Sequence, residues 1–478
     1  MFSSFVMPSI YLLDAIALVL AVICIRAFFS SRGKHYPPGP QGYPLVGSLG
    51  CASHTGHTYF VNQLAEQYAH LIRERGTIRI DWTWVLGTLR FGTRWKRHRR
   101  AFDRPFRESQ VHLFWDIQQD CAKQLVVDLS RSPKEFMAHL RLAAARATMK
   151  ITYGINVKDM NNKYVDLSEQ VTKVMTEGTK FFLVNFIPAL KWVPEWVPGA
   201  GFQRKAKEWK RTLSQMRDCP FAVSQASPVT HPTFVSQLMG GMGEEFDEDI
   251  EIVRNAAGQA YIGGVDSLTT TLAIFLRALT LFPETQKKAQ LEIDNVCVGR
   301  LPTLHDRKSL PQVDALLREL LRWHPVAPLG VPHSSTKDDV YNGHFIPGGS
   351  LIIANMGRIL SDPEIFPDPL VFNPDRFVDF DPKGDILDPR DIVFGFGKRI
   401  CPGRFLGDSF LWICIASILA AFEIKPIERI GEEASSSNGV FTTLGFLSQP
   451  YPFECSFVPR SGCTADLLSN TADSDPWS

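Results

Sequence analysis

The sequence predicts a mainly α-helical fold with small β-sheets. Residues 111–153 place apolar side chains at spacings of three and four, which is typical of amphipathic helices. Residues 249–281 form a second helical stretch that is longer and more apolar. A short hairpin is expected near residue 340, because Asn342-Gly343 is a dipeptide well suited to a two-residue type I′ turn.

The composition narrows the functional classes. The 51 Lys and Arg residues balance 50 Asp and Glu residues, so the net charge gives no reason to expect nucleic acid as a partner. The nine cysteines are odd in number and scattered, which indicates reduced cytosolic thiols and not a disulfide framework. A length of 478 residues would by itself suggest about three domains.

The first 30 residues have the character of a transmembrane anchor. Residues 9–29 form an apolar run, interrupted by Asp14 and Arg26, with about the 20 residues needed to cross a bilayer. No small-residue cleavage site follows, and the basic residues Arg32 and Lys34 favour a body that faces the cytosol. The alternative is a cleaved or interfacial segment, since a carboxylate such as Asp14 costs about 2.5–3.5 kcal/mol in the bilayer core.

A stiff hinge follows the predicted anchor. Residues 31–42 are basic and proline-rich, and the prolines of residues 37–40 break any helix and favour an extended chain. Residues 43–459 are expected to form the body of the protein. Residues 460–478, rich in Ser, Asp and Thr, are expected to be disordered.

A strongly basic helix is expected near residue 100. Trp95 and Arg99 are four residues apart and therefore share one face of it. A basic stretch with interleaved aromatic residues could be a nucleic-acid patch, but nothing else in the sequence supports one. A solvated face and a docking face for an acidic protein remain as alternatives. The basic residues are Arg94, Lys96, Arg97, Arg99, Arg100, Arg104 and Arg107.

Residues 181–202 are unusually apolar and aromatic, with Trp192 and Trp196 among several prolines. A packed core would explain this composition. An access lid that touches a bilayer would explain it equally well, because Trp favours membrane interfaces.

The apolar helix of residues 249–281 contains an unfavourable pair of glycines. Gly263 and Gly264 each cost about 1 kcal/mol relative to alanine in a helix interior, so we expect a functional reason for them. They would let the helix open beside a ligand. The acid of Asp266 and the hydroxyl of Ser267 could then deliver protons there, whereas the alternative is a kink required only for packing.

Glu319 and Arg322 are three residues apart on a predicted helix and can face each other. Their neighbours are mostly leucines, which leaves little polar surface to solvate them. Burial would require a further partner, because an unpaired buried charge is strongly destabilising.

A glycine-rich loop around Cys401 carries the strongest chemical signal. A thiolate donates charge strongly to iron and, as the axial ligand of haem, favours cleavage of the O–O bond of bound oxygen. Cys401 stands just before a predicted helix, whose N-terminal N–H groups favour an anion. Gly395, Gly397 and Gly403 would let the backbone approach a flat macrocycle. A buried structural cysteine after a glycine turn is the alternative.

This loop strongly resembles the haem-binding loop of the cytochrome P450 monooxygenases, whose pattern is Phe-x-x-Gly-x-Arg-x-Cys-x-Gly. Phe394, Gly397, Arg399, Cys401 and Gly403 fill every fixed position. The resemblance implies a cytochrome P450 fold and haem b as cofactor, with Cys401 as the axial ligand of the iron and Phe394 and Gly395 beside the haem.

The resemblance also implies roles for residues outside the loop. Trp95, Arg99, His333 and Arg399 would bind the haem propionates. Residues 263–267 resemble the oxygen-activating sequence (Ala/Gly)-Gly-x-(Asp/Glu)-Thr, with Ser267 in the threonine position. Glu319, Arg322 and Arg376 resemble the family's structural Glu-Arg-Arg lock.

The region before Trp95 departs from the family. The family places a hairpin of the small β-domain and a further helix there, but we find no second strand pattern to pair with residues 76–80. We therefore expect part of the small β-domain to be shortened or absent.

The resemblance implies a monooxygenase that inserts one atom of O2 into a lipophilic small molecule such as a terpenoid or another secondary metabolite. Electrons from NADPH would come through a separate cytochrome P450 reductase, with cytochrome b5 as a further partner, at the endoplasmic reticulum membrane. Two alternatives stay open: a haem-thiolate isomerase or dehydratase that does not use O2, and a degenerate or non-enzymatic haem-binding membrane protein.

Overall fold

The computed structural model describes residues 82–178, 192–198, 200–228, 231–240, 246–382, 384, 386–427, 441–444 and 447–460. Its contacts divide the chain into two units. One comprises Met1–Ile72 with Pro332–Ile353, and the other Arg73–Val331 with Ala354–Ser478. Within the first unit the structure describes only Pro332–Ile353. The predicted anchor and hinge, and the tail beyond Arg460, lie outside the described residues.

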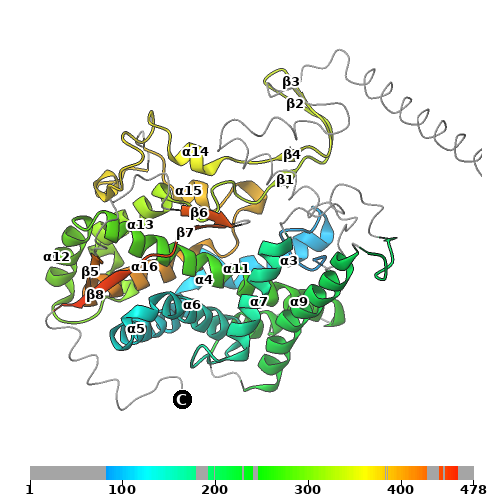
Figure 1. Ribbon diagram of the computed structural model, residues 1–478, viewed down its shortest axis with the longest axis horizontal. Helices are drawn as coiled ribbons and strands as arrows, with labels where there is room; N and C mark the ends of the chain where they lie inside the picture. The colour runs from blue at the N-terminus through cyan, green and yellow to red at the C-terminus, as the bar shows by residue number, and fades with distance from the viewer. Residues whose placement is uncertain are drawn as a thin grey trace, which may run out of the picture. The chain divides into compact units, whose positions relative to one another are not determined.

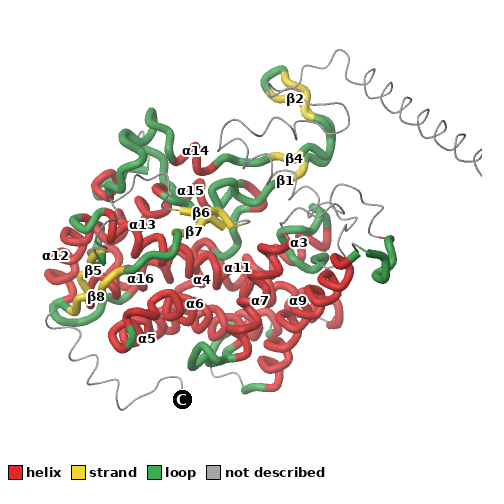
Figure 2. The backbone as a smooth tube through the Cα atoms, in the orientation of Figure 1, coloured by secondary structure: helices red, strands yellow, loops and turns green. Residues whose placement is uncertain are grey.

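The second unit is built mainly from helices, as the sequence predicts (Figures 1 and 2). The α-helices are α3 (Thr93–Phe106), α4 (Glu108–Val111), α5 (Trp115–Arg131), α6 (Phe136–Tyr153), α7 (Lys163–Gly178), α9 (Gly201–Ala226), α10 (Phe234–Met239), α11 (Phe246–Leu281), α12 (Thr285–Cys297), α13 (Pro311–Trp323), α14 (Met356–Leu360), α15 (Arg390–Val393) and α16 (Arg404–Ala421). The short 3-10 helices are η2 (His112–Phe114), η3 (Pro133–Glu135), η5 (Leu304–Ser309), η6 (Pro374–Phe377) and η7 (Gly397–Arg399).

Helix α11 is the central element of this unit. It packs against α6, α9, α16 and α3, and its residues 272–276 are completely buried. The sequence led us to expect an opening at the glycine pair, but α11 is continuous from Phe246 to Leu281. The expected interruption is therefore wrong, and packing explains one of the two glycines, Gly264, as described below.

Local sequence explains how residues 111–153 divide into separate helices. Pro133 cannot supply a backbone N–H, so α5 ends before it and the 3-10 helix η3 begins there. Helix α6 ends at Tyr153, and the next residue, Gly154, has a φ of 74°, in the left-handed region that glycine adopts without strain.

Every sheet among the described residues has two antiparallel strands. In the first unit, Asn342 and Gly343 have φ values of 49° and 79°, as the predicted type I′ turn between β2 and β3 requires. The pairs are β1 (His333–Ser334) with β4 (Leu351–Ile352) and β2 (Asp339–Tyr341) with β3 (His344–Ile346) in the first unit, and β5 (Phe422–Pro426) with β8 (Cys455–Pro459) and β6 (Phe441–Leu444) with β7 (Leu447–Pro450) in the second.

Two described helices are long and apolar enough to cross a membrane, Asp249–Leu281 and Arg404–Ala421. Their most apolar stretches are 67% and 72% buried inside the fold. Both therefore serve as core helices of the folded domain.

Candidate functional site

Cys401 lies in a tight loop between η7 and α16. Its backbone N–H donates to the carbonyl oxygen of Phe394 at 2.7 Å, which closes the loop. Gly395 and Gly397 have φ values of 78° and 57°, in the left-handed region that disfavours other residues. The sequence can adopt this loop because glycine stands at the two positions where φ is positive, a conformation that a residue with a side chain rarely adopts.

The open side of the loop has room next to its backbone. A Cβ atom added to Gly395, Gly397 or Gly403 would meet no atom within 4 Å. Gly403 also has an ordinary φ of −94°, so among the described residues neither its backbone nor a neighbouring atom requires glycine there. A glycine at position 403 is consistent with a flat ligand that lies directly against the backbone.

The environment of Cys401 acts on its thiol in two directions. Burial raises the pKa of the Cys401 thiol, because it disfavours the charged form. The N–H of Gly403 and the charges of Arg99 and Arg404 oppose that rise. The thiolate thus has a hydrogen-bond donor and two cations nearby, but it needs a stronger positive partner to be the stable form.

Three of the four predicted propionate-binding residues lie together. The Arg399 guanidinium lies 5.2 Å from the centre of the Trp95 ring and donates to the carbonyl oxygen of Leu89 at 2.8 Å. Arg99 donates to the carbonyl oxygen of Ile400 at 2.5 Å and pairs with Asp103 at 2.9 Å. Helix α3 and the cysteine loop therefore bring two cations and one indole together.

The fourth predicted residue belongs to the other unit of the chain. His333 belongs to β1 of the first unit, where it pairs with Ile352 and its side chain is exposed. Its role at the haem stays a prediction.

Asp266 and Ser267 point to different partners. The Asp266 carboxylate lies 3.0 Å from a guanidinium nitrogen of Arg141 on α6 and accepts a hydrogen bond from the Thr172 hydroxyl at 2.5 Å. The Ser267 hydroxyl donates to the carbonyl oxygen of Gly263 at 2.8 Å. Among the described residues no hydrogen bond joins Asp266 to Ser267.

The two glycines of α11 differ in their surroundings. A Cβ on Gly264 would lie 2.4 Å from Cγ2 of Thr148 on α6, a distance at which something must move. A Cβ on Gly263 would meet nothing within 4 Å, and Gly263 is exposed. Close packing on α6 therefore explains Gly264, whereas Gly263 faces open space.

The Glu319-Arg322-Arg376 group comes together in the core. Glu319 and Arg322 are 0% and 1% exposed and form two hydrogen bonds of 2.7 Å. Arg322 also donates to the carbonyl oxygens of Leu360 and Pro369 at 3.0 Å. Arg376 is a looser member, with its Nε atom 3.6 Å from the Glu319 carboxylate.

Sequence reasoning missed several residues of the site. Thr172 is 94 positions from Asp266, and no local pattern marks either it or Arg141 as a partner. Arg404 could have been found, because it stands three positions after Cys401 at the start of α16. Its guanidinium donates to the carbonyl oxygen of Cys401 at 3.3 Å.

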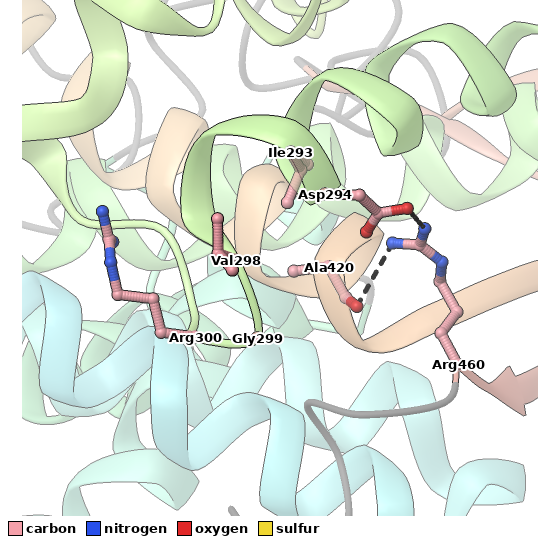
Figure 3. A pocket seen from close by; sticks show the side chains of 7 residues that line it. All are labelled: Ile293, Asp294, Val298, Gly299, Arg300, Ala420 and Arg460. Atoms are coloured by element: carbon pink, nitrogen blue, oxygen red, sulfur yellow. Dashed lines mark hydrogen bonds and ion pairs between the residues drawn. The ribbon is translucent and has the colours of Figure 1, made fainter.

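Two cavities lie outside the cysteine loop. One, of about 290 Å³, is lined by Arg141, Thr269 and Gln449 among others, and so lies beside the partner of Asp266. The other, of about 200 Å³, lies between the ends of α12 and α16 (Figure 3). There Arg460 pairs with Asp294 at 2.6 Å and donates to the carbonyl of Ala420 at 3.3 Å, so its charge is already used to cap α16.

The helical fold and the cysteine loop define a haem-thiolate class of protein, and comparisons with known proteins agree. The family model described as cytochrome P450 matches residues 88–457. Cytochrome P450 monooxygenase COX2 of Coprinopsis cinerea is 36% identical, covering 96% of this chain and 96% of that protein. Tryptamine 4-monooxygenase of Psilocybe cyanescens is 32% identical, covering 92% of this chain and 96% of that protein. A zebra fish cytochrome P450 structure with progesterone has a TM-score of 0.63 at 23% identity, covering 81% of this chain and 87% of that one.

The chain belongs to the cytochrome P450 family. It is a monooxygenase, and the family implies haem as its cofactor. The family match begins at residue 88, and the alignment with COX2 spans 511 positions against the 478 residues of this chain. Some residues of that relative therefore have no counterpart here.

Proposed function

We propose that this protein is a membrane-attached monooxygenase that oxidises a lipophilic small molecule, with Cys401 as the haem ligand. The observation that carries the proposal is the joint position of Cys401, Arg99, Arg399 and Trp95 on α3 and the cysteine loop. A soft thiol beside two cations and a bare backbone is the donor set that a haem with two propionates requires.

The residues of this group fit a haem. The Nε1 atom of Trp95 is buried and has no hydrogen-bond partner among the described residues, so it is free to donate to a propionate. Arg99 and Arg399 use part of their N–H groups on backbone carbonyls and can turn others to a carboxylate. When bound, the haem would activate O2 for insertion of one oxygen atom into the substrate.

We assign proton handling to Asp266 and Ser267. Ser267 holds its hydroxyl proton on the carbonyl oxygen of Gly263, next to the exposed side of α11. Asp266 is held by Arg141, and Arg141 lines the cavity of about 290 Å³. Asp266 would take up protons from this side, and the hydroxyl of Ser267 would present them to the site. Because the two side chains share no hydrogen bond among the described residues, the transfer between them would require an intervening water molecule.

The basic helix α3 suits an acidic electron donor. Arg94 and Arg97 already pair with Glu251 and Asp249 of α11. Lys96, Arg100, Arg104 and Arg107 keep exposed side chains. We propose that this exposed set docks a reductase that carries electrons from NADPH, or cytochrome b5. Arg100→Glu should slow reduction and weaken its salt dependence, whereas Arg211→Glu on α9 should change neither.

Attachment to the endoplasmic reticulum membrane, with the body facing the cytosol, rests on residues 1–30. Trp192 and Trp196 are 66% and 83% exposed, so they favour the membrane-contact alternative over a packed core. Deletion of residues 1–33 should move much of the protein out of the membrane fraction. Full retention in the pellet after an alkaline carbonate wash would mean that another segment holds it.

The substrate class is the least constrained part of the proposal. The relatives include a tryptamine monooxygenase, so aromatic amines stand beside terpenoids and other secondary metabolites as candidates. A screen for substrate-induced spin shifts with both classes would decide between them. Absence of a shift with every lipophilic compound tested would contradict the proposal.

The decisive experiment on the ligand is Cys401→Ser. The red-shifted absorption band of the reduced carbon monoxide complex requires a thiolate, so this variant should lose it completely. Cys219→Ser changes an exposed cysteine of α9 and should keep the band. A band that survives in Cys401→Ser would overturn the assignment.

The two alternatives make different predictions for turnover. An isomerase or dehydratase would convert its substrate without consuming NADPH or O2. A degenerate protein would bind haem poorly. The expected shortening of the region before Trp95, most of which lies outside the described residues, would favour this alternative, because that region should cap the pocket. Measuring haem per polypeptide beside a version with a family-like insert between residues 71 and 83 tests this. Stoichiometric haem and coupled turnover in the unmodified chain would eliminate both alternatives.

A further inference from the structure

A cluster of six charged side chains includes residues that flank the cysteine loop in the chain, and none of the six belongs to the family motifs. It contains three carboxylates and three guanidinium groups, so its charges balance. Each side chain is only about 16–24% exposed. We call this set the arginine clasp, and its members are Arg307, Asp314, Arg318, Asp388, Arg390 and Asp408.

The clasp joins the two ends of the cysteine loop. Arg390 opens α15, four residues before Phe394, and Asp408 lies in α16, five residues after Gly403. The Nε atom of Arg390 donates to Oδ1 of Asp408 at 2.7 Å. This hydrogen bond therefore closes the base of the loop that carries Cys401.

The same clasp fixes the loop to the core. Asp314 on α13 accepts hydrogen bonds from both terminal nitrogens of Arg390, at 2.8 and 3.2 Å. Arg307 bridges Asp314 and Asp408, each at 2.6 Å. The loop base is thus attached to α13, the helix that also carries Glu319 and Arg322.

The partners of Asp314 keep its carboxyl group ionised. Burial alone would raise the pKa of the Asp314 carboxyl, but the hydrogen bond and charge of Arg390, with the charges of Arg307 and Arg318, hold that pKa below its usual range. Arg318 also pairs with Asp388, which accepts a hydrogen bond from the N–H of Arg390 at 2.9 Å.

A buried ionic cluster contributes more to the relative orientation of the elements it joins than to the stability of the fold. Desolvation offsets much of the attraction between buried charges, and apolar replacements are often equally stable. Paired guanidinium and carboxylate groups nevertheless fix the angle between the elements that carry them. Such an arrangement is suited to holding α15, the cysteine loop and α16 in one fixed relative orientation.

We propose that Arg390 and Asp408 are positioning residues for the Cys401 thiolate. By holding α15 and α16 at the base of the loop, they fix where the sulfur atom stands relative to the haem iron. This inference rests on the proposed function, in which Cys401 is the iron ligand. It predicts that breaking the clasp loosens thiolate ligation by more than it lowers the stability of the fold.

The test compares two carboxylates of similar burial. Asp408→Asn removes one charge from the clasp, whereas Asp128→Asn removes the partner of Arg146, an ion pair of 2.5 Å between α5 and α6 with side chains 13% and 5% exposed. For each variant we would follow the conversion of the red-shifted carbon monoxide band into the blue-shifted band of haem without thiolate ligation. Unfolding would be followed in parallel by far-ultraviolet circular dichroism.

We expect Asp408→Asn to accelerate the band conversion about tenfold, equivalent to ~1.4 kcal/mol in the barrier, while the helices stay folded. Asp128→Asn should lower the unfolding midpoint without accelerating conversion in the folded protein. Asp408→Glu should restore most of the wild-type rate because it keeps the charge.

Three outcomes separate the possibilities. Equal acceleration in Asp408→Asn and Asp128→Asn would reduce the clasp to general stabilisation and overturn the inference. A wild-type protein without the red-shifted band would instead overturn the proposed function. If Asp408→Asn does not fold, Arg390→Lys replaces it, since lysine keeps the charge but cannot bridge Asp314 and Asp408. A wild-type conversion rate in Arg390→Lys would then contradict the inference.

Discussion

The cysteine loop and the middle of α11 are both rich in glycine, but glycine is there for different reasons. In the loop, Gly395 and Gly397 are required by the backbone, which has positive φ at both positions. In α11 the backbone is helical throughout, and Gly264 is required by Thr148 of the neighbouring helix. Gly263, beside it, meets neither condition.

This difference shows that one residue type can mark three kinds of site. A positive φ is a local property of the chain, and a close approach is a property of two helices. A glycine that meets neither condition, like Gly263 or Gly403, remains as a candidate for contact with a ligand. Substitutions at these glycines distinguish the three kinds of site.

The largest expected effect is a loss of folding stability at acidic pH, caused by His324, which follows the last residue of α13. The glycine variants should therefore be compared above pH 6.5. Burial lowers the pKa of His324 from 6.5 to about 3, and its ring forms a 2.7 Å hydrogen bond with Ser448. The unfolded chain therefore takes up a proton below pH 6.5 that the folded chain refuses. The free energy of unfolding has its full value above pH 6.5. It should fall by up to ~1.4 kcal/mol per pH unit as the pH drops toward 3.

Chemical unfolding at several pH values measures this slope. His324→Asn keeps a hydrogen-bonding group but cannot titrate there, so it should flatten the profile between pH 6.5 and about 3. His112→Asn, which changes an exposed histidine, should leave the slope as it is. An unchanged slope in His324→Asn would show that another group dominates.

Gly264→Ala is the next largest effect. The new methyl group would lie 2.4 Å from Cγ2 of Thr148, and overpacking of this kind costs roughly 1–3 kcal/mol. The double variant Gly264→Ala/Thr148→Ser removes the clashing methyl group but keeps the hydroxyl that bonds to Ala144. Urea unfolding should show that most of the loss is recovered. No recovery would mean that Gly264 is required for a reason other than Thr148.

Gly397→Ala tests the backbone explanation in the cysteine loop. Alanine at a φ of 57° costs about 1–2 kcal/mol, so the apoprotein should be less stable by that amount. Gly403→Ala has an ordinary φ and open space, and should leave apoprotein stability unchanged while weakening haem retention. Equal losses of stability in both variants would remove the distinction between them.

Gly263→Ala should stabilise the protein slightly. Alanine is favoured over glycine in a helix interior by roughly 0.5–1 kcal/mol, and the new methyl group meets no atom within 4 Å. We expect a small rise in the thermal midpoint. A fall would show that the space beside Gly263 is less open than the fold indicates.

Ser267→Ala should have the smallest effect on stability, within about 0.5 kcal/mol, because it removes a hydroxyl at the exposed side of α11. Its effect should lie in coupling, with more peroxide released per NADPH consumed and haem content unchanged. Ser267→Thr keeps the hydroxyl and should remain coupled. Wild-type coupling in Ser267→Ala would contradict the proton-handling role.

The sequence predicted local features well. The hairpin at Asn342-Gly343 and the helical fold class are confirmed, because turn chemistry and apolar spacing are set by neighbours in the chain. The family assignment is also confirmed, because its motif is one continuous decapeptide around Cys401. The expected opening of α11 is wrong, because glycine in a sequence shows that a side chain is absent and does not show what occupies its place.

By itself, then, the sequence determined the thiol-bearing loop, the turn glycines and the helical periodicity of this protein. Only the tertiary structure decided that Asp266 faces Arg141 and Thr172. It also decided that Thr148 leaves no room for a side chain at Gly264. Likewise, the contacts by which Arg390 and Asp408 attach the base of the cysteine loop to Asp314 could be seen only in the fold. The physical reason is the separation along the chain over which each interaction acts. Torsion preferences and helix spacing act over a few residues, whereas a salt bridge or a close helix contact depends on how elements distant in the chain pack together.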